Sequence, residues 1–349
     1  MFGFWKKKNV LVLGSDGMLG HDLYRKLRKL SVGGAVGIVY GMDGGEMRNL
    51  GVPYRRHALG ELFFPSSVRF DVCVNCMAMT DTKAAEETQE GRELSYKLNA
   101  LAPKFVAESC AHWKVKLVHV STDYVFDQDD SADQNMPRDY SDPNPRSIYG
   151  THKLLGEQFV RNAYADAGMP NGYAVCRTSW LYGMHRSKSF VHKIIAAAVK
   201  AAAEGKDHLD VTSNERSVPT STGFLCNFII DRFVKEWRMG QVFHAVPHLP
   251  LGKGPCGVSR AEWAGAILKV FSGRGANDLS LGDVLGKISR DGFVRPVARP
   301  RSYYPPFSAM KPSAAVDGVA GCDCLDEASR FVYANRQKLL DFAERVLAG

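Results

Sequence analysis

The chain opens on a strand pattern that leads directly into a glycine-containing turn and then into a helix pattern. Val10–Gly14 is a short run of apolar and β-branched residues, and leucines recur at helical spacing in Leu19–Leu30. Between these two segments, glycines stand at Gly14, Gly17 and Gly20. A strand that turns at once into an amphipathic helix is the first part of a strand–helix–strand crossover, which joins parallel strands. This unit restricts the possible folds more than any other feature of the sequence.

The first half of the chain repeats the same alternation. Further strand patterns lie at Ala35–Tyr40, Val72–Cys76, Lys116–Ser121 and Tyr173–Ser179, and helix patterns lie at Ser95–His112 and Tyr149–Ala163. Strands that alternate with helices form a parallel sheet covered on both faces, and right-handed crossovers make that sheet doubly wound. We therefore expect an α/β fold with a doubly wound, Rossmann-like parallel sheet.

The second half of the chain is less regular. Its helix patterns are Phe190–Glu204, Thr222–Trp237, Arg260–Phe271 and a terminal one near Asp326–Leu347. Gly- and Pro-rich stretches separate these helices, as in Pro247–Gly257. We expect a smaller, loop-rich C-terminal lobe that closes over a ligand.

Composition and cysteine usage indicate a cytoplasmic globular protein. No apolar run approaches the length of about 20 residues that crosses a membrane. In Met1–Lys8 the lysines follow the apolar residues, the reverse of a secretory signal. The eight cysteines are therefore expected to be reduced thiols. Cys73 and Cys76 lie in an apolar strand pattern and should be buried and structural, whereas Cys322 and Cys324 lie in a polar loop without a second pair at zinc-like spacing. We expect no metal site.

The net charge of +8 and the pI of about 9.0 favour anionic ligands such as phosphates. The basic residues are dispersed, however, and no Lys/Arg block is interleaved with aromatic residues. We therefore expect neither a nucleic-acid partner nor a membrane partner.

The glycine turn is the first candidate ligand site. Glycines at a strand-to-helix turn let the backbone approach a pyrophosphate closely, and the helix N-terminus offers free N–H groups and a positive dipole end. Their G-x-x-G-x-x-G spacing is the looser form found in short-chain dehydrogenases. The expected contacts to a dinucleotide in this turn are Gly14, Asp16, Gly17, Met18, Leu19 and Gly20. We expect the dinucleotide-binding domain to comprise residues 1–180 together with 215–245, where the chain returns to it. The substrate-binding lobe should comprise 181–214 and 246–349.

The preference between NAD and NADP stays open. Asp43 follows the second strand pattern, where an acidic residue holds the adenosine ribose hydroxyls and favours NAD. Arg48, Arg55 and Arg56 follow closely and are candidate partners for the 2′-phosphate of NADP. Asp43 is equally compatible with a simple turn residue.

Thr122, Tyr149 and Lys153 form the candidate catalytic set. Tyr149 and Lys153 are four residues apart at the start of a helix pattern and so share one helical face. Thr122 follows the strand pattern Lys116–Ser121 and should face the crevice at the carboxyl end of the sheet. Reduction of a ketone needs a hydride on carbon and a proton on oxygen, and a tyrosine hydroxyl can donate that proton. Because the ordinary tyrosine pKa is about 10, we expect the Lys153 ammonium and an oxidised nicotinamide to lower it.

Several segments in the correct order resemble the dTDP-4-dehydrorhamnose reductase family of extended short-chain dehydrogenases, from about Val10 to Met310. The segments that carry the resemblance are Val118–Phe126, Ile148–Glu157, Arg177–Gly183, Ser217–Thr220 and Arg299–Ser302. The resemblance implies hydride transfer from NADPH or NADH to C4 of a dTDP-linked keto sugar, which converts dTDP-4-dehydro-L-rhamnose to dTDP-L-rhamnose. It also implies that a homodimer is possible.

The same resemblance assigns roles to individual residues. Thr122 orients the sugar carbonyl, Tyr149 protonates it, and Lys153 binds the nicotinamide ribose. Further cofactor contacts are assigned to Ala78, Asn99 and Ser121. Substrate contacts are assigned to Thr80, Thr122, Asp123, Tyr124, Trp180 and Arg299. Trp180 is also compatible with a role as a core aromatic residue. Arg299 is a candidate partner for the substrate's diphosphate and is also compatible with a residue that only caps a loop.

Some positions depart from the family pattern. Met79, Thr82 and Lys83 replace an aromatic residue, a valine and an acid that flank the cofactor and substrate. The loop Asp127–Arg146 is longer and more acidic than in the family, and the tail beyond Pro312 also departs. These differences leave the sugar open.

Two alternatives follow from the same residues. One is another nucleotide-sugar reductase, epimerase or 4,6-dehydratase, although a dehydratase places Asp-Glu after the central threonine and this chain has Asp123-Tyr124. The other is a non-catalytic NADP-binding subunit similar to the regulatory subunit of methionine adenosyltransferase. Retention of Tyr149 and Lys153 favours an enzyme.

Overall fold

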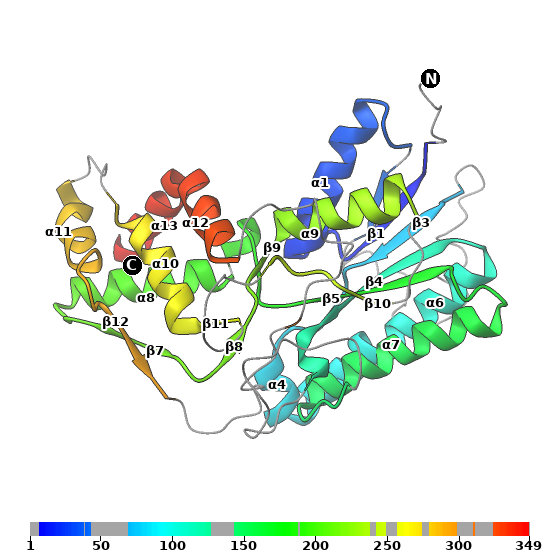
Figure 1. Ribbon diagram of the computed structural model, residues 1–349, viewed down its shortest axis with the longest axis horizontal. Coiled ribbons are helices and arrows are strands. Elements are labelled where there is room, and N and C mark those ends of the chain that lie inside the picture. Colours follow the sequence, from blue (N-terminus) through cyan, green and yellow to red (C-terminus); the bar gives the residue numbers. More distant parts are fainter. Residues whose placement is uncertain are drawn as a thin grey trace.

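The centre of the molecule is a six-stranded parallel sheet with strand order β10-β5-β4-β3-β1-β2 (Figure 1). The computed structural model describes residues 7–37, 39–42, 69–126, 143–187, 189–237, 242–248, 257–273, 279–298, 310 and 324–348. The sheet strands are β1 (Val10–Leu13), β2 (Val39–Met42), β3 (Val72–Asn75), β4 (Lys116–Thr122), β5 (Tyr173–Thr178) and β10 (Val242–His244). Each neighbouring pair runs parallel. The predicted doubly wound α/β class is confirmed.

Alternate strand residues face two helical layers. Val10 and Val12 of β1 pack toward α1 (Met18–Val32) and α9 (Thr222–Ile229). Leu11 and Leu13 pack toward the other layer. That second layer consists of α6 (Ala102–His112) and α7 (Ile148–Asp166). Because alternate residues of each strand face one or the other buried layer, the strand patterns are continuously apolar.

Two helices that the periodicity predicts as continuous are interrupted. Instead of one helix over Ser95–His112, the chain forms α5 (Gln89–Tyr96), a π-helical turn (Lys97–Leu101) and then α6. Pro103 lies at the start of α6, and a proline has no N–H to donate to the carbonyl four residues earlier, which favours a break in the ladder. The helix predicted over Thr222–Trp237 likewise ends as a π-helical turn, Ile230–Lys235, after α9.

The remaining helices build a second lobe beside the sheet, on the left of Figure 1. It contains α8 (Phe190–Ala203), α10 (Arg260–Phe271), α11 (Leu279–Ile288), α12 (Cys324–Ala334) and α13 (Arg336–Ala348). The terminal helix expected near Asp326–Leu347 is thus two helices that meet at Asn335, whose amide side chain donates to the Phe331 carbonyl oxygen. Trp263 lies at the centre of this lobe's core and is fully buried.

Short strand pairs complete the second lobe and its connection to the sheet. The pairs are β7 (Leu209–Thr212) with β12 (Val294–Val297), β8 (Arg216–Ser217) with β11 (Val258–Ser259), and β6 (Leu181–Tyr182) with β9 (Thr220–Ser221). Because α9 and β10 lie in the sequence after β6 to β9, the chain leaves the sheet, builds part of the second lobe and returns. One short helix, α4 (Thr82–Glu87), lies beside α7 at the carboxyl edge of the sheet.

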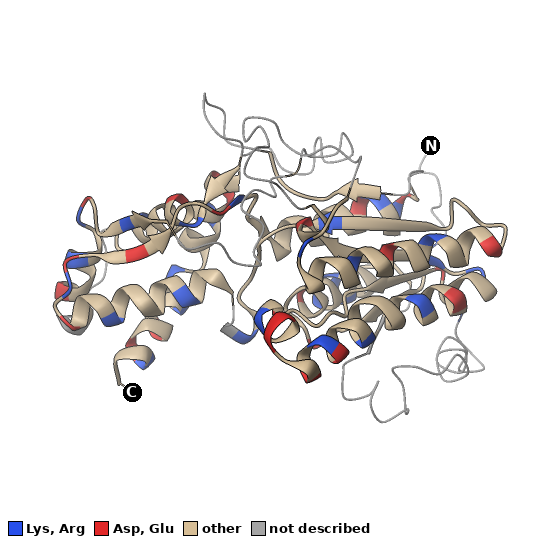
Figure 2. Cartoon of the chain, turned by 90° about the horizontal axis from the view of Figure 1, so that it is seen from below, with Lys and Arg blue, Asp and Glu red and all other residues tan. Residues whose placement is uncertain are grey.

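The described surface carries mixed charge. In the view of Figure 2, Lys and Arg residues alternate with Asp and Glu along the helices of both lobes. No helix of the described residues is long and apolar enough to cross a membrane.

Candidate functional site

A cleft of about 1040 Å³ lies where the sheet meets the second lobe. Its floor is formed by the carboxyl ends of β1, β3 and β4, and β1 and β3 mark the point where the strand order reverses. Doubly wound sheets bind their ligands at this switch point. The predicted residues that line the cleft are Gly14, Asp16, Gly17, Met18, Leu19, Ala78, Thr80, Ser121, Thr122, Asp123, Tyr124, Tyr149, Lys153 and Trp180.

The glycine turn has the geometry that a pyrophosphate needs. Gly14 adopts a positive φ of 77°, and a Cβ atom there would lie 3.1 Å from the backbone nitrogen of Met77. A Cβ atom on Gly20 would lie 2.0 Å from the carbonyl oxygen of Gly14, so only glycine lets α1 start this close to β1. Gly17 caps α1 without a side-chain hydrogen bond, and the first turn has no acidic residue. The N–H groups of α1 therefore suit the phosphates of a dinucleotide.

The acidic residue in this turn is paired with the second lobe. Arg186 donates to the Asp16 carboxylate, with 3.2 Å between N and O. The His185 Nε2 atom lies 3.1 Å from the Asp16 carbonyl oxygen, and the His185 ring stacks on His21 of α1 at 3.7 Å between centroids. These contacts, which sequence reasoning missed, partly neutralise Asp16 and connect the glycine turn to the segment before α8.

The start of α7 is fixed by two oxygen acceptors. The Ser147 hydroxyl accepts from the Gly150 amide at 2.9 Å, and Glu86 of α4 accepts from the Ile148 amide at 2.6 Å. Caps of this kind satisfy N–H groups that a helix start leaves unpaired. They hold Tyr149 and Lys153 one turn apart, and both side chains line the cleft, as predicted.

The pKa of Tyr149 is raised above its ordinary value, first by burial and then by the nearby Asp123 carboxylate, while a hydrogen bond with Thr122 acts in the opposite direction. The expected lowering of this pKa is wrong for the protein's own groups, because desolvation of the phenolate outweighs the favourable contact. Tyr149 therefore stays in its phenol form, which is the proton-donating form, across the physiological pH range.

Lys153 is only 2% exposed, and burial lowers its pKa to about 8, against the opposing attraction of Glu157. Its Nζ atom donates to the Val120 carbonyl oxygen at 2.7 Å. Glu157 in turn accepts from Arg177 at 2.7 Å in a buried ion pair and from the Ser121 hydroxyl. This network, also missed by sequence reasoning, lies directly behind the end of β4.

Thr122 and Asp123 share a hydroxyl-rich network. The Thr122 hydroxyl donates to one Asp123 oxygen at 3.1 Å. Ser179 and Ser217 each donate to the other Asp123 oxygen at 2.7 Å. Asp123 is 1% exposed, so these three hydroxyls replace the water that its carboxylate loses on burial.

Residues of the second lobe and of its junction with the sheet form an aromatic and charged wall, called the second-lobe wall. Trp180 has a φ of 37°, in the left-handed region that costs a non-glycine residue about 1–3 kcal/mol, and such strain is concentrated at functional sites. Its indole stacks toward Trp263, with 5.8 Å between centroids, and the Arg260 guanidinium lies 4.1 Å from the Trp180 centroid. Glu215, Phe190 and Lys193 complete this wall. The Trp180 side chain therefore lines the cleft and also packs on the core of the second lobe.

Four predicted contacts have a different position or no description. Gly20 lies behind the turn, and Asn99 is buried, where its amide bonds both the N–H and the carbonyl of Met79. A direct cofactor contact by either residue stays a prediction. Asp43 and Arg299 lie outside the described residues, as do Arg48, Arg55, Arg56 and most of the acidic loop.

The thiols near the cleft fit a structural role. Cys73 is fully buried in β3, as predicted, and Cys76 is half-buried at the cleft floor. Burial raises the pKa of both thiols well above the ordinary value. Cys324, expected in a polar loop, is instead the buried first residue of α12. Among the described residues, no cluster of three or more His, Cys, Asp or Glu side chains could hold a metal ion.

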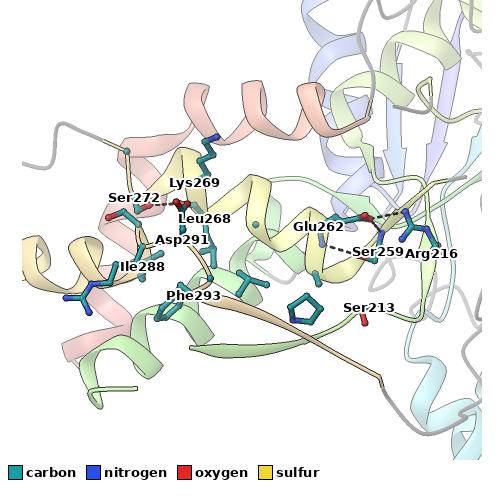
Figure 3. A pocket seen from close by; sticks show the side chains of 18 residues that line it. Ser213, Arg216, Ser259, Glu262, Leu268, Lys269, Ser272, Ile288, Asp291 and Phe293 are labelled. Carbon is teal, nitrogen blue, oxygen red and sulfur yellow. Dashed lines mark hydrogen bonds and ion pairs between the residues drawn. The ribbon is translucent and has the colours of Figure 1, made fainter. Parts of the chain in front are cut away.

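A second cavity, of about 520 Å³, lies in the second lobe away from the sheet (Figure 3). It runs along α10 toward the turn before β12, and Arg216, Ser259 and Glu262 form one of its ends. Arg216 and Glu262 are paired there, with 3.0 Å between N and O. This cavity shares none of the predicted catalytic residues.

Comparison with known proteins agrees with the geometry. The family model described as RmlD substrate binding domain matches residues 8–304. The dTDP-4-dehydrorhamnose reductase of Mycobacterium tuberculosis (strain ATCC 25618 / H37Rv) is 35% identical over 176 residues, which are 50% of this chain and 53% of that protein. The dTDP-4-keto-6-deoxy-D-glucose reductase of Streptomyces niveus is 30% identical over 67% of this chain and 71% of that protein.

The chain thus spans about half the length of the mycobacterial relative that it matches. Among solved structures, the dTDP-4-dehydrorhamnose reductase of Bacillus anthracis in complex with NADP superposes with a TM-score of 0.69. That likeness has 23% identity over 94% of this chain and 100% of the other, and it shows the shared fold. From the match over residues 8–304, the chain belongs to the RmlD substrate-binding-domain family, as its sequence segments predicted.

Proposed function

We propose that this chain is an NAD(P)H-dependent reductase that converts the 4-keto group of a dTDP-linked deoxyhexose to an alcohol, with dTDP-4-dehydro-L-rhamnose as the expected substrate. The observation that carries the proposal is the meeting of Thr122, Tyr149 and Lys153 with the glycine turn in one cleft. The names of the mycobacterial and Streptomyces relatives support the reaction and the substrate class.

The cofactor is held by the glycine turn and by the end of β4. Gly14, Gly17 and the N-terminus of α1 bind the pyrophosphate, and Lys153 with Ser121 binds the nicotinamide side. When bound, the reduced nicotinamide supplies the hydride for the sugar carbon. NADPH and NADH are both candidates, and the NADP complex of the Bacillus anthracis protein supports NADPH.

Tyr149 supplies the proton. Its hydroxyl donates to the carbonyl oxygen as the C4 carbon is reduced, so that the phenol O–H bond breaks while an alcohol O–H bond forms. The raised pKa keeps this group protonated before the step. Thr122 holds the carbonyl oxygen by turning its hydroxyl from Asp123, and the Lys153 ammonium stabilises the phenolate that forms.

We assign residues 1–180 and 215–245 to the dinucleotide-binding domain and the remaining residues to the substrate-binding lobe. The packing of α9 on α1 and the pairing of β10 with β5 support the assignment of 215–245 to the dinucleotide-binding domain. The nucleotide sugar then enters between the two parts. A homodimer remains a prediction that light scattering can check.

The test is reduction of dTDP-4-dehydro-L-rhamnose by NADPH and by NADH. The wild type should turn over, and Tyr149→Phe should lose about 10²–10⁴-fold in kcat, the usual contribution of a general acid. Tyr164→Phe is the matched control, because Tyr164 lies on the same helix but donates to the Val115 carbonyl oxygen outside the cleft. Equal rates for wild type and Tyr149→Phe would contradict the assigned proton donor.

The same assay separates the alternatives. Cofactor binding without turnover of any keto sugar would favour the regulatory-subunit hypothesis. Turnover of a different nucleotide sugar would retain the reductase and replace the substrate. A dehydratase is the weaker alternative, because both oxygens of Asp123 already accept hydroxyl hydrogen bonds and the next residue is Tyr124.

A further inference from the structure

We propose that Arg260 binds the diphosphate of the nucleotide-sugar substrate, an inference that rests on the proposed function. Arg260 is the first residue of α10, where Ser259 and Glu262 form a reciprocal capping box. This cap fixes the start of the helix, and the Arg260 side chain lines the wall of the cleft that the second lobe contributes. Its guanidinium is thus held by the fold at the place where a ligand enters between the lobes.

The guanidinium is oriented by two aromatic rings and one carboxylate. It lies 4.1 Å from the Trp180 centroid and 5.2 Å from the Phe190 centroid. Its Nε atom lies 3.3 Å from a Glu215 carboxylate oxygen. Stacking on an aromatic face is favourable for arginine and leaves the edge of the guanidinium available for hydrogen bonds.

The terminal amino groups of Arg260 have no protein acceptor within the described part of the chain. Arg177 donates Nη2 to Glu157 but leaves Nη1 without a partner, and Arg336 donates Nη2 to the Gly273 carbonyl oxygen. A fixed fork of N–H donors matches the oxygens of a phosphate in a bidentate arrangement. Arg260 is therefore preorganised for an oxyanion.

The surroundings of Arg260 also favour an anion. Ser189, Phe190 and Lys193 belong to the start of α8 and line the same cleft. The Ser189 hydroxyl bonds His192 instead of capping the helix, and the first turn of α8 contains no acidic residue. Among the described residues that line the cleft, Glu215 is the acidic side chain beside Arg260, whereas Asp16 pairs with Arg186 and Asp123 accepts from hydroxyls. With Lys193 and the positive end of α8, this part of the wall suits a ligand with two phosphates better than a neutral one.

Arg216 provides a natural comparison. It is adjacent to Glu215 in sequence, but it lines the second cavity instead of the cleft (Figure 3). Its terminal nitrogen donates to the Gly257 carbonyl oxygen at 2.8 Å and pairs with Glu262. Glu215 precedes β8 and Arg216 is the first residue of β8, and the two side chains line different cavities. Arg216→Gln removes an ion pair to Glu262 but changes no side chain that lines the cleft, and Glu262 still accepts from the Ser259 amide in the capping box.

The experiment measures binding of dTDP, thymidine and NADP⁺ by calorimetry to the wild type, Arg260→Gln, Arg260→Lys and Arg216→Gln. Arg260→Gln should weaken dTDP binding by about 10–100-fold, as expected for loss of a charge-assisted bidentate contact. Thymidine and NADP⁺ binding should change by less than about threefold, and Arg260→Lys should recover part of the dTDP affinity because it restores the charge but not the fork. Arg216→Gln should bind dTDP like the wild type. In turnover, Arg260→Gln should raise KM and leave kcat within about threefold.

Several results would overturn the inference. These are unchanged dTDP affinity in Arg260→Gln, an equal loss for thymidine, or an equal loss in Arg216→Gln. Binding of UDP and GDP to the wild type distinguishes failure of the Arg260 contact from failure of the proposed function. A wild type that binds another nucleoside diphosphate with the same dependence on Arg260 would retain the diphosphate contact and replace the dTDP substrate. A wild type that binds NADP⁺ but no nucleoside diphosphate would refute both.

Discussion

The two walls of the cleft differ in how deeply their polar and charged side chains are buried. On the sheet wall, Thr122, Asp123 and Lys153 are almost completely buried, and their polar atoms are held by hydroxyls, carbonyls and the ion pair behind β4. On the second-lobe wall, Arg186 and Arg260 retain exposed surface and each make one ion pair. The buried wall fixes the reacting groups, and the exposed wall can exchange protein partners for ligand oxygens.

This difference separates chemistry from recognition. Desolvation on the sheet wall shifts the pKa of Tyr149 upward and that of Lys153 downward. The Asp16–Arg186 pair remains in contact with water, where its attraction is weak and screened by salt, and the Arg260 side chain is 23% exposed beside the more buried Glu215. Under the proposed function, substitutions on the second-lobe wall therefore change the bound sugar or nucleotide and leave the proton-transfer groups in place.

The largest expected effect concerns the buried ion pair behind the sheet wall. Glu157→Gln leaves the Arg177 guanidinium buried without its counter-charge, since the side chains are 4% and 6% exposed for Arg177 and Glu157. Removing one partner of a buried pair costs about 3–5 kcal/mol in the free energy of unfolding. Urea denaturation followed by circular dichroism measures this loss.

Asp16→Asn is the matched control, because the Asp16–Arg186 pair connects the glycine turn to the second-lobe wall. It breaks the Asp16–Arg186 pair, whose side chains are 36% and 51% exposed, so the expected loss is about 0–1 kcal/mol. Equal losses in the two variants would show that burial does not distinguish the two walls energetically.

Sequence reasoning predicted the sheet wall because its signals are local. The glycine spacing of the first turn lies within seven residues of sequence, and the offset of four residues between Tyr149 and Lys153 defines a helix face. Thr122 follows from its place directly after a strand pattern, and the resemblance to known segments added Asp123 and Trp180. All of these residues except Gly20 line the cleft, and the order of strands and helices was sufficient to predict the doubly wound sheet.

The second-lobe wall could not be predicted in the same way, because its contacts join distant positions. Arg260 and Glu215 are 45 residues apart, and Arg186 and Asp16 are 170 residues apart. The Ser259–Glu262 capping box does indicate where α10 begins, but not which cavity its first side chain faces. The π-helical turn at Lys97–Leu101 was missed because apolar periodicity continues through it.

A second prediction uses the opposite pKa shifts on the sheet wall. If the Lys153 ammonium supports proton transfer, the rate should be full below pH 8 and fall about tenfold per pH unit above its pKa of about 8. Tyr149 contributes no decrease there, because its own pKa is raised. The pH profile of kcat with saturating substrate measures this decrease, the alkaline limb of the profile.

Unfolding of the protein does not explain a decrease in kcat above pH 8. Between about pH 8 and 10.5, the unfolded chain binds a proton at Lys153 that the folded chain releases, so the contribution of this residue to stability rises with pH. In Glu157→Gln the limb should move to lower pH, because Glu157 raises the Lys153 pKa. A limb above pH 10, unmoved by Glu157→Gln, would assign the titration to another group.

The smallest expected effect contrasts two glycines. Gly265 lies inside α10 beside the second cavity, and a Cβ atom there would meet no heavy atom within 4 Å. Gly265→Ala should raise the free energy of unfolding by about 0.5–1 kcal/mol, because alanine favours helix and reduces the entropy of the unfolded chain. Thermal and urea unfolding both measure the gain.

Gly20→Ala should have the opposite sign. Its Cβ atom would lie 2.0 Å from the Gly14 carbonyl oxygen, so either β1 or α1 must move, at a cost of about 1–3 kcal/mol. NADP⁺ affinity should fall with it, since the same shift opens the glycine turn. If Gly265→Ala were instead destabilising, the space beside α10 would have to be filled in solution, because helix propensity alone favours the alanine.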